Sequence, residues 1–209
     1  MYLPTYFRED DRETLLAFMR AHSFATVVST VNGIPFATHI PIGVELRDET
    51  VFLAGHVSKA NEHVHAFAPE SSAPSLIIFS GPHAYVSPSA YESRESVPTW
   101  NYIAVHAVGV LQTVRFADAP HTMETMLDTM IAQYDPAYGN QWRSLPEKFR
   151  DGMMRGVVGF EMPVQQLEGK YKLSQNRSAH DQASVQAMLD ASADEPARAI
   201  AQAMQSRHA

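Results

Sequence analysis

The chain of 209 residues contains no cysteine. Disulfide bonds, thiolate-bound metal ions and cysteine nucleophiles are therefore excluded. Positive charge is also scarce, because 16 Lys and Arg residues stand against 23 Asp and Glu residues and leave a formal net charge of -7. This balance argues against a surface coated with nucleic-acid-binding charge, although it leaves room for a local basic patch.

Long apolar runs are missing too, since none approaches the roughly 20 residues that a membrane-spanning helix needs. The first ten residues lack the basic and apolar regions of a secretory signal peptide. We therefore expect a cytoplasmic protein with no membrane partner. The sequence also lacks the HExxH, GxGxxG, P-loop and GxSxG signatures, which removes several common enzyme classes.

The composition that remains suits one globular domain with a sizeable core, because 45% of the residues are hydrophobic. Segments with strand patterns outnumber the helices that could cross between parallel strands, and most connections are short. This predicts an antiparallel barrel or meander with helices on its outside. Strands are predicted over residues 24–30, 34–45, 50–54, 75–80, 101–115 and 157–161.

Capping residues and helical spacing of apolar residues predict several helices. Their expected starts lie near residues 10, 59, 118, 144 and 178. We expect the main domain to cover residues 1–190. Residues 191–209 are rich in alanine and are expected to form a tail or a helix.

Glycine and proline residues predict how the strands are interrupted. The Val-Asn-Gly sequence at residues 31–33 favours a tight turn with positive φ. Pro35 and Pro41 indicate an edge strand or a bulge, because proline cannot donate to a strand ladder. Gly109 predicts a bend in the longest strand, and residues 81–98, rich in serine and proline, predict an irregular loop.

The first candidate site is the sequence GHVSKANEH at residues 55–63. It follows a predicted strand and opens a predicted helix, where unpaired backbone N–H groups favour an anion. Ser58 supplies a hydroxyl, Lys59 a mobile positive charge and Asn61 an amide, which together suit a phosphate group. The alternative is an ordinary helix start with a solvated lysine.

Two further segments carry candidate binding residues. Trp100 and Tyr102 could stack on a planar ring, with Thr99 and Asn101 bonding the polar atoms at its edge. The alternative is a pair of aromatic residues that caps a barrel. The second segment, residues 170–178, places three cations and several amide groups before a helix start. This segment could bind an anion. Equally, it could be a solvated linker or form salt bridges with the chain's own carboxylates.

The ten histidines do not predict a metal site. His63 and His65 are two residues apart and would point to different faces of a helix. His39, His56 and His106 lie in different strand regions and could converge only through the fold. Neutral or surface histidines are the preferred interpretation, and no metal is expected.

Four motifs occur in order: residues 55–61 (GHVSKAN), 81–88 (GPHAYVSP), 97–102 (VPTWNY) and 172–177 (KLSQNR). Together they closely resemble the PaiB family, described as FMN-binding negative transcriptional regulators. The resemblance implies a mainly-β α+β fold, a split antiparallel β-barrel of the FMN-binding type with peripheral helices. Related proteins are pyridoxamine-phosphate-oxidase-like and flavin-reductase-like.

Such proteins are homodimers with FMN sites at the subunit interface. The resemblance implies that Ser58, Lys59 and Asn61 meet the FMN phosphate. It also implies a second group of residues that approach the isoalloxazine ring, in part from the opposite subunit, or close the site. This group comprises His39, Thr99, Trp100, Asn101, Gln175 and Arg177.

The sequence leaves three functions open. The first, implied by the family, is a transcriptional regulator or flavin-linked sensor; DNA is weakly supported as a partner, since no basic helix-turn-helix is evident. The second is an FMN-dependent oxidoreductase, a flavin reductase or a pyridoxamine-phosphate-oxidase-like enzyme, with His39, His56 and Tyr102 as available proton donors. The third is a split barrel that binds haem through a histidine such as His39.

Overall fold

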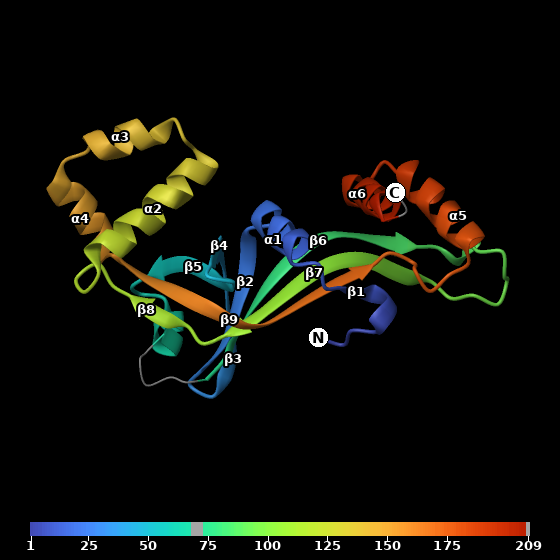
Figure 1. Cartoon of the computed structure of the whole chain (residues 1–209), viewed down its shortest axis with the longest axis horizontal. Coiled ribbons are helices and arrows are strands. Elements are labelled where there is room, and N and C mark those ends of the chain that lie inside the picture. The colour runs from blue at the N-terminus through green and yellow to red at the C-terminus, as the bar shows by residue number, and fades with distance from the viewer. Residues whose placement is uncertain (68–72, 208–209) are drawn as a thin grey trace. The chain divides into compact units, whose positions relative to one another are not determined.

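The computed structural model describes residues 1–67 and 73–207, which form strands and helices in a mainly-β α+β arrangement (Figure 1). The strands are β1 (Arg8–Glu9), β2 (Phe24–Val31), β3 (Ile34–Pro41), β4 (Gly43–Arg47), β5 (Thr50–Ser58), β6 (Ser75–Val86), β7 (Thr99–Gly109), β8 (Gln112–Val114) and β9 (Val157–Lys172). The α-helices are α1 (Arg12–Ala21), α2 (Pro120–Tyr134), α3 (Tyr138–Ser144), α4 (Glu147–Arg155), α5 (Ala179–Asp190) and α6 (Glu195–Ser206). Short 3-10 helices occupy Thr5–Phe7, Glu62–Phe67 and Pro88–Ala90.

The strands follow the order β3-β2-β6-β7-β9-β5-β4, and β1 and β8 each pair with β9. Within the described residues this path ends at β3 and at β4, so the barrel is split rather than closed. The predicted fold class, an α+β split antiparallel barrel with peripheral helices, is confirmed. No helix in the described part of the chain is long and apolar enough to cross a membrane.

The chain forms two compact units, each built from separate stretches of sequence. The first unit contains residues 1–18, 80–106 and 168–209, and the second contains residues 19–79 and 107–167. Strands β6, β7 and β9 contribute residues to both units. The predicted domain boundary at residue 190 remains a prediction.

The second unit is organised around a tight hairpin and a buried strand face. Asn32 (φ 53°) and Gly33 (φ 78°) join β2 to β3, as the predicted turn requires. β3, with its two prolines, lies at one end of the strand order, which confirms the predicted edge strand. The core of this unit contains, among others, Leu53, Phe67, Ile77, Phe79, Phe160 and Met162, all buried.

The first unit is completed by the two C-terminal helices. Ser178 caps α5, because its hydroxyl accepts a hydrogen bond of 3.1 Å from the Asp181 N–H, as predicted. α5 packs against α6. The apolar face of α6 is buried through Ala197, Ile200, Ala201 and Met204, so most of the alanine-rich segment is an ordered helix.

Several predicted strand boundaries are wrong. The strand expected over residues 34–45 is divided at Ile42, which is buried and whose N–H donates to the Ser23 carbonyl at 2.8 Å. The predicted irregular loop over residues 81–98 starts only at residue 87, because β6 continues through the Gly-Pro pair at 81–82 to Val86. Likewise, the final strand extends from residue 157 to Lys172 rather than to residue 161.

Two predicted helix starts also need correction. α1 is capped by Asp11, whose Oδ2 accepts from the Thr14 N–H at 2.8 Å, rather than by Asp10. Ser144 does not open a helix, because it is the last residue of α3 and its hydroxyl donates to the Gln141 carbonyl at 2.7 Å. The next helix, α4, follows Pro146 instead. Among the residues of α2, only Met123 is buried.

Candidate functional site

The turn after β5 carries the three residues predicted to bind a phosphate. β5 continues to Ser58, and the Lys59 N–H donates to the Gly156 carbonyl at 2.9 Å. The Asn61 side chain then caps the 3-10 helix Glu62–Phe67, because its Oδ1 accepts from the His63 N–H at 2.9 Å. The helix predicted to start at residue 59 is therefore shorter and of the 3-10 type. Donors for an anion here come from side chains rather than from an α-helix dipole.

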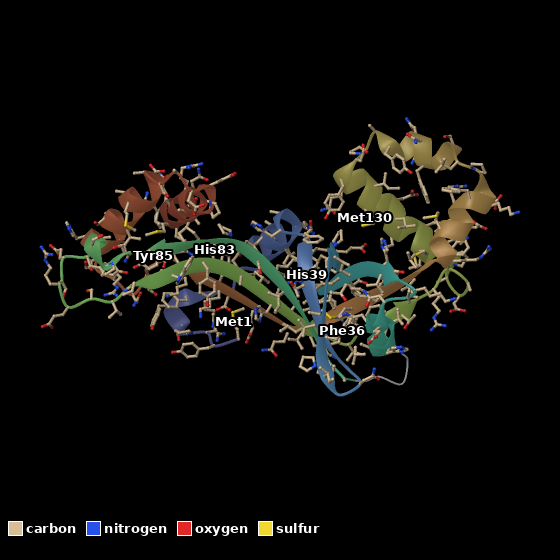
Figure 2. All side chains as sticks on the ribbon, turned by 180° about the vertical axis from the view of Figure 1, so that it is seen from behind. Met1, Phe36, His39, His83, Tyr85 and Met130 are labelled. Carbon is tan, nitrogen blue, oxygen red and sulfur yellow. The ribbon has the colours of Figure 1, made fainter. Side chains whose placement is uncertain are left out.

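A cavity of about 630 Å³ lies beside this turn, and we call it the β3–β5 cavity. Three of the predicted site residues, His39, Ser58 and Asn61, line it. Figure 2 labels His39 on β3 and Met130 on α2, both of which line this cavity. The other lining residues are Thr38, Ile40, Pro41, His56, Val57, Gly152, Met153, Gly156 and Val157.

The predicted cation of this group, Lys59, is exposed and does not line the cavity itself. It is nevertheless adjacent in sequence to Ser58, and its backbone is held by Gly156, which lines the cavity. A lysine side chain is long and mobile, so it can reach an anion from such a position. The donor set of hydroxyl, amide and nearby ammonium groups is chemically suited to a phosphate.

A second cavity of about 590 Å³, the α2 cavity, shares His56 and Met130 with the first. One wall is a face of α2, where threonines alternate with Met126 and Met130 at helical spacing. The opposite wall comes from β4, β5 and β9. It carries a charged group in which Arg47 bonds both Glu45 (2.5 Å) and Glu161 (2.7 Å). The α2 cavity therefore combines an apolar floor with a few fixed polar groups, as small-molecule sites do.

His56 faces both cavities, and its protonation affects stability. Burial lowers the pKa of His56 below its ordinary value of 6.5. Near pH 6.5 the unfolded chain binds a proton at this histidine and the folded chain does not, so stability is lost as the pH falls from 6.5 toward the folded pKa.

We expect His56→Gln to flatten the decline in the free energy of unfolding as the pH falls below 6.5. The matched control is His65→Gln, at an exposed histidine that lines neither cavity, and it should leave the slope unchanged. Denaturant titrations at several pH values measure both slopes. Identical slopes for His56→Gln and the wild-type protein would contradict the buried environment of His56.

The remaining predicted site residues belong to the first unit, where they serve different purposes. Trp100 is 51% exposed and forms an aromatic group with His83 and Tyr85 of β6, at ring distances of 5.6 and 6.1 Å. Figure 2 labels His83 and Tyr85 on this strand. Asn101, in contrast, is fully buried, and its amide donates to the Ser174 hydroxyl at 2.9 Å. Its predicted contact with a ring edge is therefore unsupported by the geometry of this chain.

The Gln175 amide also forms its hydrogen bonds within its own turn. Its Oε1 accepts from the Leu173 N–H at 2.7 Å, and its Nε2 donates to the Tyr171 carbonyl at 2.5 Å. The guanidinium carbon of Arg177 lies over the Tyr91 ring, 4.1 Å from its centroid, in a cation–π contact. We therefore interpret Gln175 as a residue that shapes the turn after β9, and Arg177 as a donor held near Tyr91.

Lysine residues join Arg177 in a cluster of positive charge. Lys172 donates to the Thr99 hydroxyl at 2.5 Å, so two of the predicted segments meet here. Burial, reinforced by the charges of Lys170 and Arg177, lowers the pKa of Lys172. Lys170 is buried and lies over the Tyr102 ring at 5.2 Å. The basic segment, for which the sequence left both an anion site and a solvated linker open, is thus part strand and part turn, and its charges lie close together.

The sequence did not point to Thr38 or to the buried His63 as parts of the site. Thr38 lines the β3–β5 cavity, and its hydroxyl bonds the Nδ1 atom of His63 at 2.8 Å. Strand alternation could have placed Thr38 on the same face as Phe36 and Ile40, but nothing in the spacing marked it as polar and functional. Among the described residues, no cluster of three or more His, Asp or Glu side chains is placed to hold a metal ion.

Comparison with known proteins identifies the family. Residues 1–166 match the family model described as "Putative FMN-binding domain". The chain belongs to this FMN-binding family. It is also 35% identical over 209 residues to the Protease synthase and sporulation protein PAI 2 of Bacillus subtilis, covering 99% of this chain and 98% of that protein. The predicted PaiB resemblance and the predicted cofactor, FMN, are therefore confirmed.

More distant similarities support the fold. A 30% identical stretch of 120 residues relates the chain to the uncharacterized protein YKL070W of Saccharomyces cerevisiae, over 54% of this chain and 69% of that protein. The FAD and haem binding protein of Mycobacterium smegmatis superposes with a TM-score of 0.61 at 17% identity, covering 85% of this chain and 79% of that one. The flavocytochrome Anf3 of Azotobacter vinelandii gives the same TM-score and identity, over 85% and 75% of the two chains.

Proposed function

We propose that this protein is a homodimeric flavoprotein that binds the FMN phosphate in the β3–β5 cavity. The observation that supports this most directly is a set of polar residues that line the cavity. Thr38 and Ser58, which carry hydroxyls, and Asn61, which carries an amide, all line it, and Lys59 is adjacent in sequence. When bound, FMN would supply one- or two-electron redox chemistry, and these residues would hold and orient it.

The isoalloxazine ring would extend along β3 past His39. Ile40 and Pro41 line the cavity there and offer apolar contact. His39 is held by a hydrogen bond of 3.0 Å between its Nδ1 and the Thr26 hydroxyl. Its other ring nitrogen is then available for a polar atom of the ring.

The first-unit residues would reach FMN from the partner subunit. Trp100 offers an exposed aromatic face, and Arg177 and Lys172 offer positive charge. A dimer in which each site takes Ser58 and Lys59 from one subunit, and Trp100 and Arg177 from the other, would use both groups of predicted residues. Such an arrangement would also cover the exposed aromatic group of Trp100.

Titration of the flavin-free protein with FMN tests the proposal, with quenching of flavin fluorescence as the signal. Saturable quenching at one FMN per subunit is expected. Riboflavin lacks the phosphate and should bind far more weakly, because it offers no negative charge to the hydrogen-bond donors of the β3–β5 cavity. The absence of any saturable FMN binding would overturn the proposal.

Trp100→Ala should change the degree to which bound flavin fluorescence is quenched, because an aromatic ring in contact with the isoalloxazine quenches it. The chain's other tryptophan, Trp142 in α3, provides the matched control as Trp142→Ala. Equal quenching in Trp100→Ala and wild-type protein would show that Trp100 does not contact the ring.

Mixing two variants that each bind FMN weakly distinguishes a site shared between subunits from a site within one chain. In a dimer with shared sites, a Lys59→Ala subunit paired with an Arg177→Ala subunit contains one doubly altered site and one intact site. We therefore expect the mixture to regain tight FMN sites that neither variant has alone. If mixing restores none, although both variants exchange subunits, Lys59 and Arg177 do not belong to a shared site.

The biological role that we propose is a flavin-linked sensor or transcriptional regulator, in which FMN occupancy or redox state changes the dimer surface. Support for this role comes from the family resemblance. The net charge of -7 gives DNA binding little electrostatic help. Retention of an operator fragment that depends on both salt and DNA sequence would support regulation.

A second candidate, an FMN-dependent oxidoreductase, is favoured by the α2 cavity. Because this cavity shares His56 and Met130 with the β3–β5 cavity, a small substrate there would lie next to bound flavin. The two roles are separated by stopped-flow reduction with NADH or NADPH followed by an electron acceptor. Rapid reduction with turnover would support the enzyme, whereas slow reduction with selective DNA retention would support the regulator.

A further inference from the structure

His63 is fully buried, and both of its ring nitrogens are hydrogen-bonded. Nδ1 lies 2.8 Å from the Thr38 hydroxyl, and Nε2 lies 2.8 Å from the Ser29 hydroxyl. The Ser29 hydroxyl is in turn 2.6 Å from that of Ser75. A chain of hydroxyl groups joined by one imidazole therefore runs from the wall of the β3–β5 cavity into the sheet. Of this chain, the proposed phosphate site uses only Thr38.

The direction of the first bond in this chain is set by Asn61. The His63 backbone N–H can only donate, so the Asn61 atom that it bonds at 2.9 Å must be the acceptor, Oδ1. The other terminal atom of that amide is consequently the NH2 group, which faces the Thr38 oxygen at 3.4 Å. Thr38 therefore accepts a hydrogen bond from Asn61.

The tautomer of His63 then decides what Thr38 presents to the cavity. With the proton on Nε2, Nδ1 is an acceptor, and the Thr38 hydroxyl donates its single proton to it. With the proton on Nδ1, Thr38 accepts from both Nδ1–H and the Asn61 amide, so its own proton is free to donate into the cavity. Ser29 and Ser75 can satisfy either tautomer, because their hydroxyl protons can both reverse direction.

Charge does not complicate this choice. Burial lowers the pKa of His63 below 6.5, and the ring packs against Phe36 at 5.4 Å and Phe67 at 5.6 Å. In the flavin-free protein the imidazole is therefore neutral at physiological pH, and the position of its one proton is the variable. An anion in the cavity needs donors, so it favours the tautomer that frees the Thr38 proton.

We propose that Thr38 donates a hydrogen bond to the phosphate bound in the β3–β5 cavity, and that His63 is the positioning residue that makes this possible through its Nδ1–H tautomer. This inference rests on the proposed function, namely that the FMN phosphate occupies that cavity. The ligand chemistry is that of a phosphate monoester, and the reversal of the hydroxyl chain accompanies its binding.

The tautomer is observed directly by long-range ¹H–¹⁵N correlation spectra of protein labelled with ¹⁵N-histidine, with His63 assigned by connectivity to its backbone amide. The protonated and unprotonated ring nitrogens have well separated ¹⁵N shifts. Spectra are compared for flavin-free protein and for protein saturated with FMN or with riboflavin. We expect the Nδ1–H tautomer with FMN, and no such selection with riboflavin, which has the same ring but no phosphate.

Affinity measurements give the second readout. Thr38→Val preserves the shape of the side chain but removes the hydroxyl, and we expect it to raise the Kd for FMN about tenfold while leaving the Kd for riboflavin unchanged. Thr38→Ser should restore most of the FMN affinity. Thr30→Val, at an exposed position of the neighbouring strand β2, is the matched control and should change neither Kd.

The outcomes separate this inference from the proposed function. FMN binding that leaves the His63 tautomer unchanged, or that is equally tight in Thr38→Val, would overturn the role of Thr38 and His63 while the FMN site stands. Failure of the wild-type protein to bind FMN would overturn both. Loss of riboflavin and FMN affinity together in Thr38→Val would assign Thr38 to packing and would also overturn the inference.

Discussion

Replacing Gly109 with alanine is expected to lower the free energy of unfolding by about 3 kcal/mol, at the upper end of the usual cost of overpacking. Gly109 is the last residue of β7, at the bend predicted from the sequence. A Cβ atom there would lie 2.5 Å from the Pro163 carbonyl oxygen and 2.7 Å from the Met162 Cγ. The backbone oxygen belongs to the neighbouring strand β9 and cannot rotate away, so the strands must separate.

Urea denaturation followed by circular dichroism measures this effect. Gly152→Ala is a matched control, because no atom lies within 4 Å of a Cβ placed at Gly152 in α4. Alanine in the interior of a helix should instead stabilise the protein by about 0.5–1 kcal/mol. A Gly109→Ala protein as stable as the wild type would contradict the close approach of β7 and β9.

Replacing Lys59 with alanine is expected to weaken FMN binding by about 1.5–3 kcal/mol, which is roughly a 10- to 150-fold rise in Kd. In the described part of the chain the Lys59 ammonium has no ion pair, so its charge is available to a ligand. Removing it would leave the phosphate with neutral donors only on this side of the site. Because the side chain is exposed, the free energy of unfolding should change little.

Isothermal titration calorimetry with FMN and with riboflavin measures the loss. Lys148→Ala removes an exposed lysine of α4 that lines neither cavity, and it controls for the general effect of charge. Riboflavin affinity should be the same in all three proteins. An unchanged FMN affinity in Lys59→Ala would exclude this lysine from the site, and with it the interpretation of residues 55–63 as the phosphate loop.

Local chemistry explains which parts of this fold could be predicted. Three predicted features follow from the local preferences of the residues that form them: the turn at Asn32 and Gly33, the edge strand with Pro35 and Pro41, and the side-chain cap at Ser178. The order of the strands, in contrast, depends on pairings between distant segments. Nothing local in residues 157–172 indicates that this segment pairs with β1, β5, β7 and β8.

In the candidate site, too, locally determined features could be predicted and those that depend on distant segments could not. Ser58 and Asn61 were predicted because hydroxyl and amide groups beside a lysine suit a phosphate, and both line the β3–β5 cavity. Asn101 was predicted to face a ring, but it is buried against Ser174, since strand alternation fixes its face and the sequence did not reveal which face α6 covers. Thr38 was not predicted, because its hydrogen bond to His63 joins residues 25 positions apart and no local pattern marks it.

The discontinuous make-up of the two units constrains how the chain can acquire its cavity during synthesis. Ser58 at the end of β5 pairs with Val157 at the start of β9, so the wall that supports the phosphate loop is absent until most of the chain has left the ribosome. Pairings between such distant segments carry a high entropic cost of loop closure and slow the folding reaction. A nascent or truncated chain that ends before β9 would present β5 with an unpaired edge, which is prone to aggregation. A cofactor that binds only the completed cavity would then act late in folding, by stabilising strands that have already assembled.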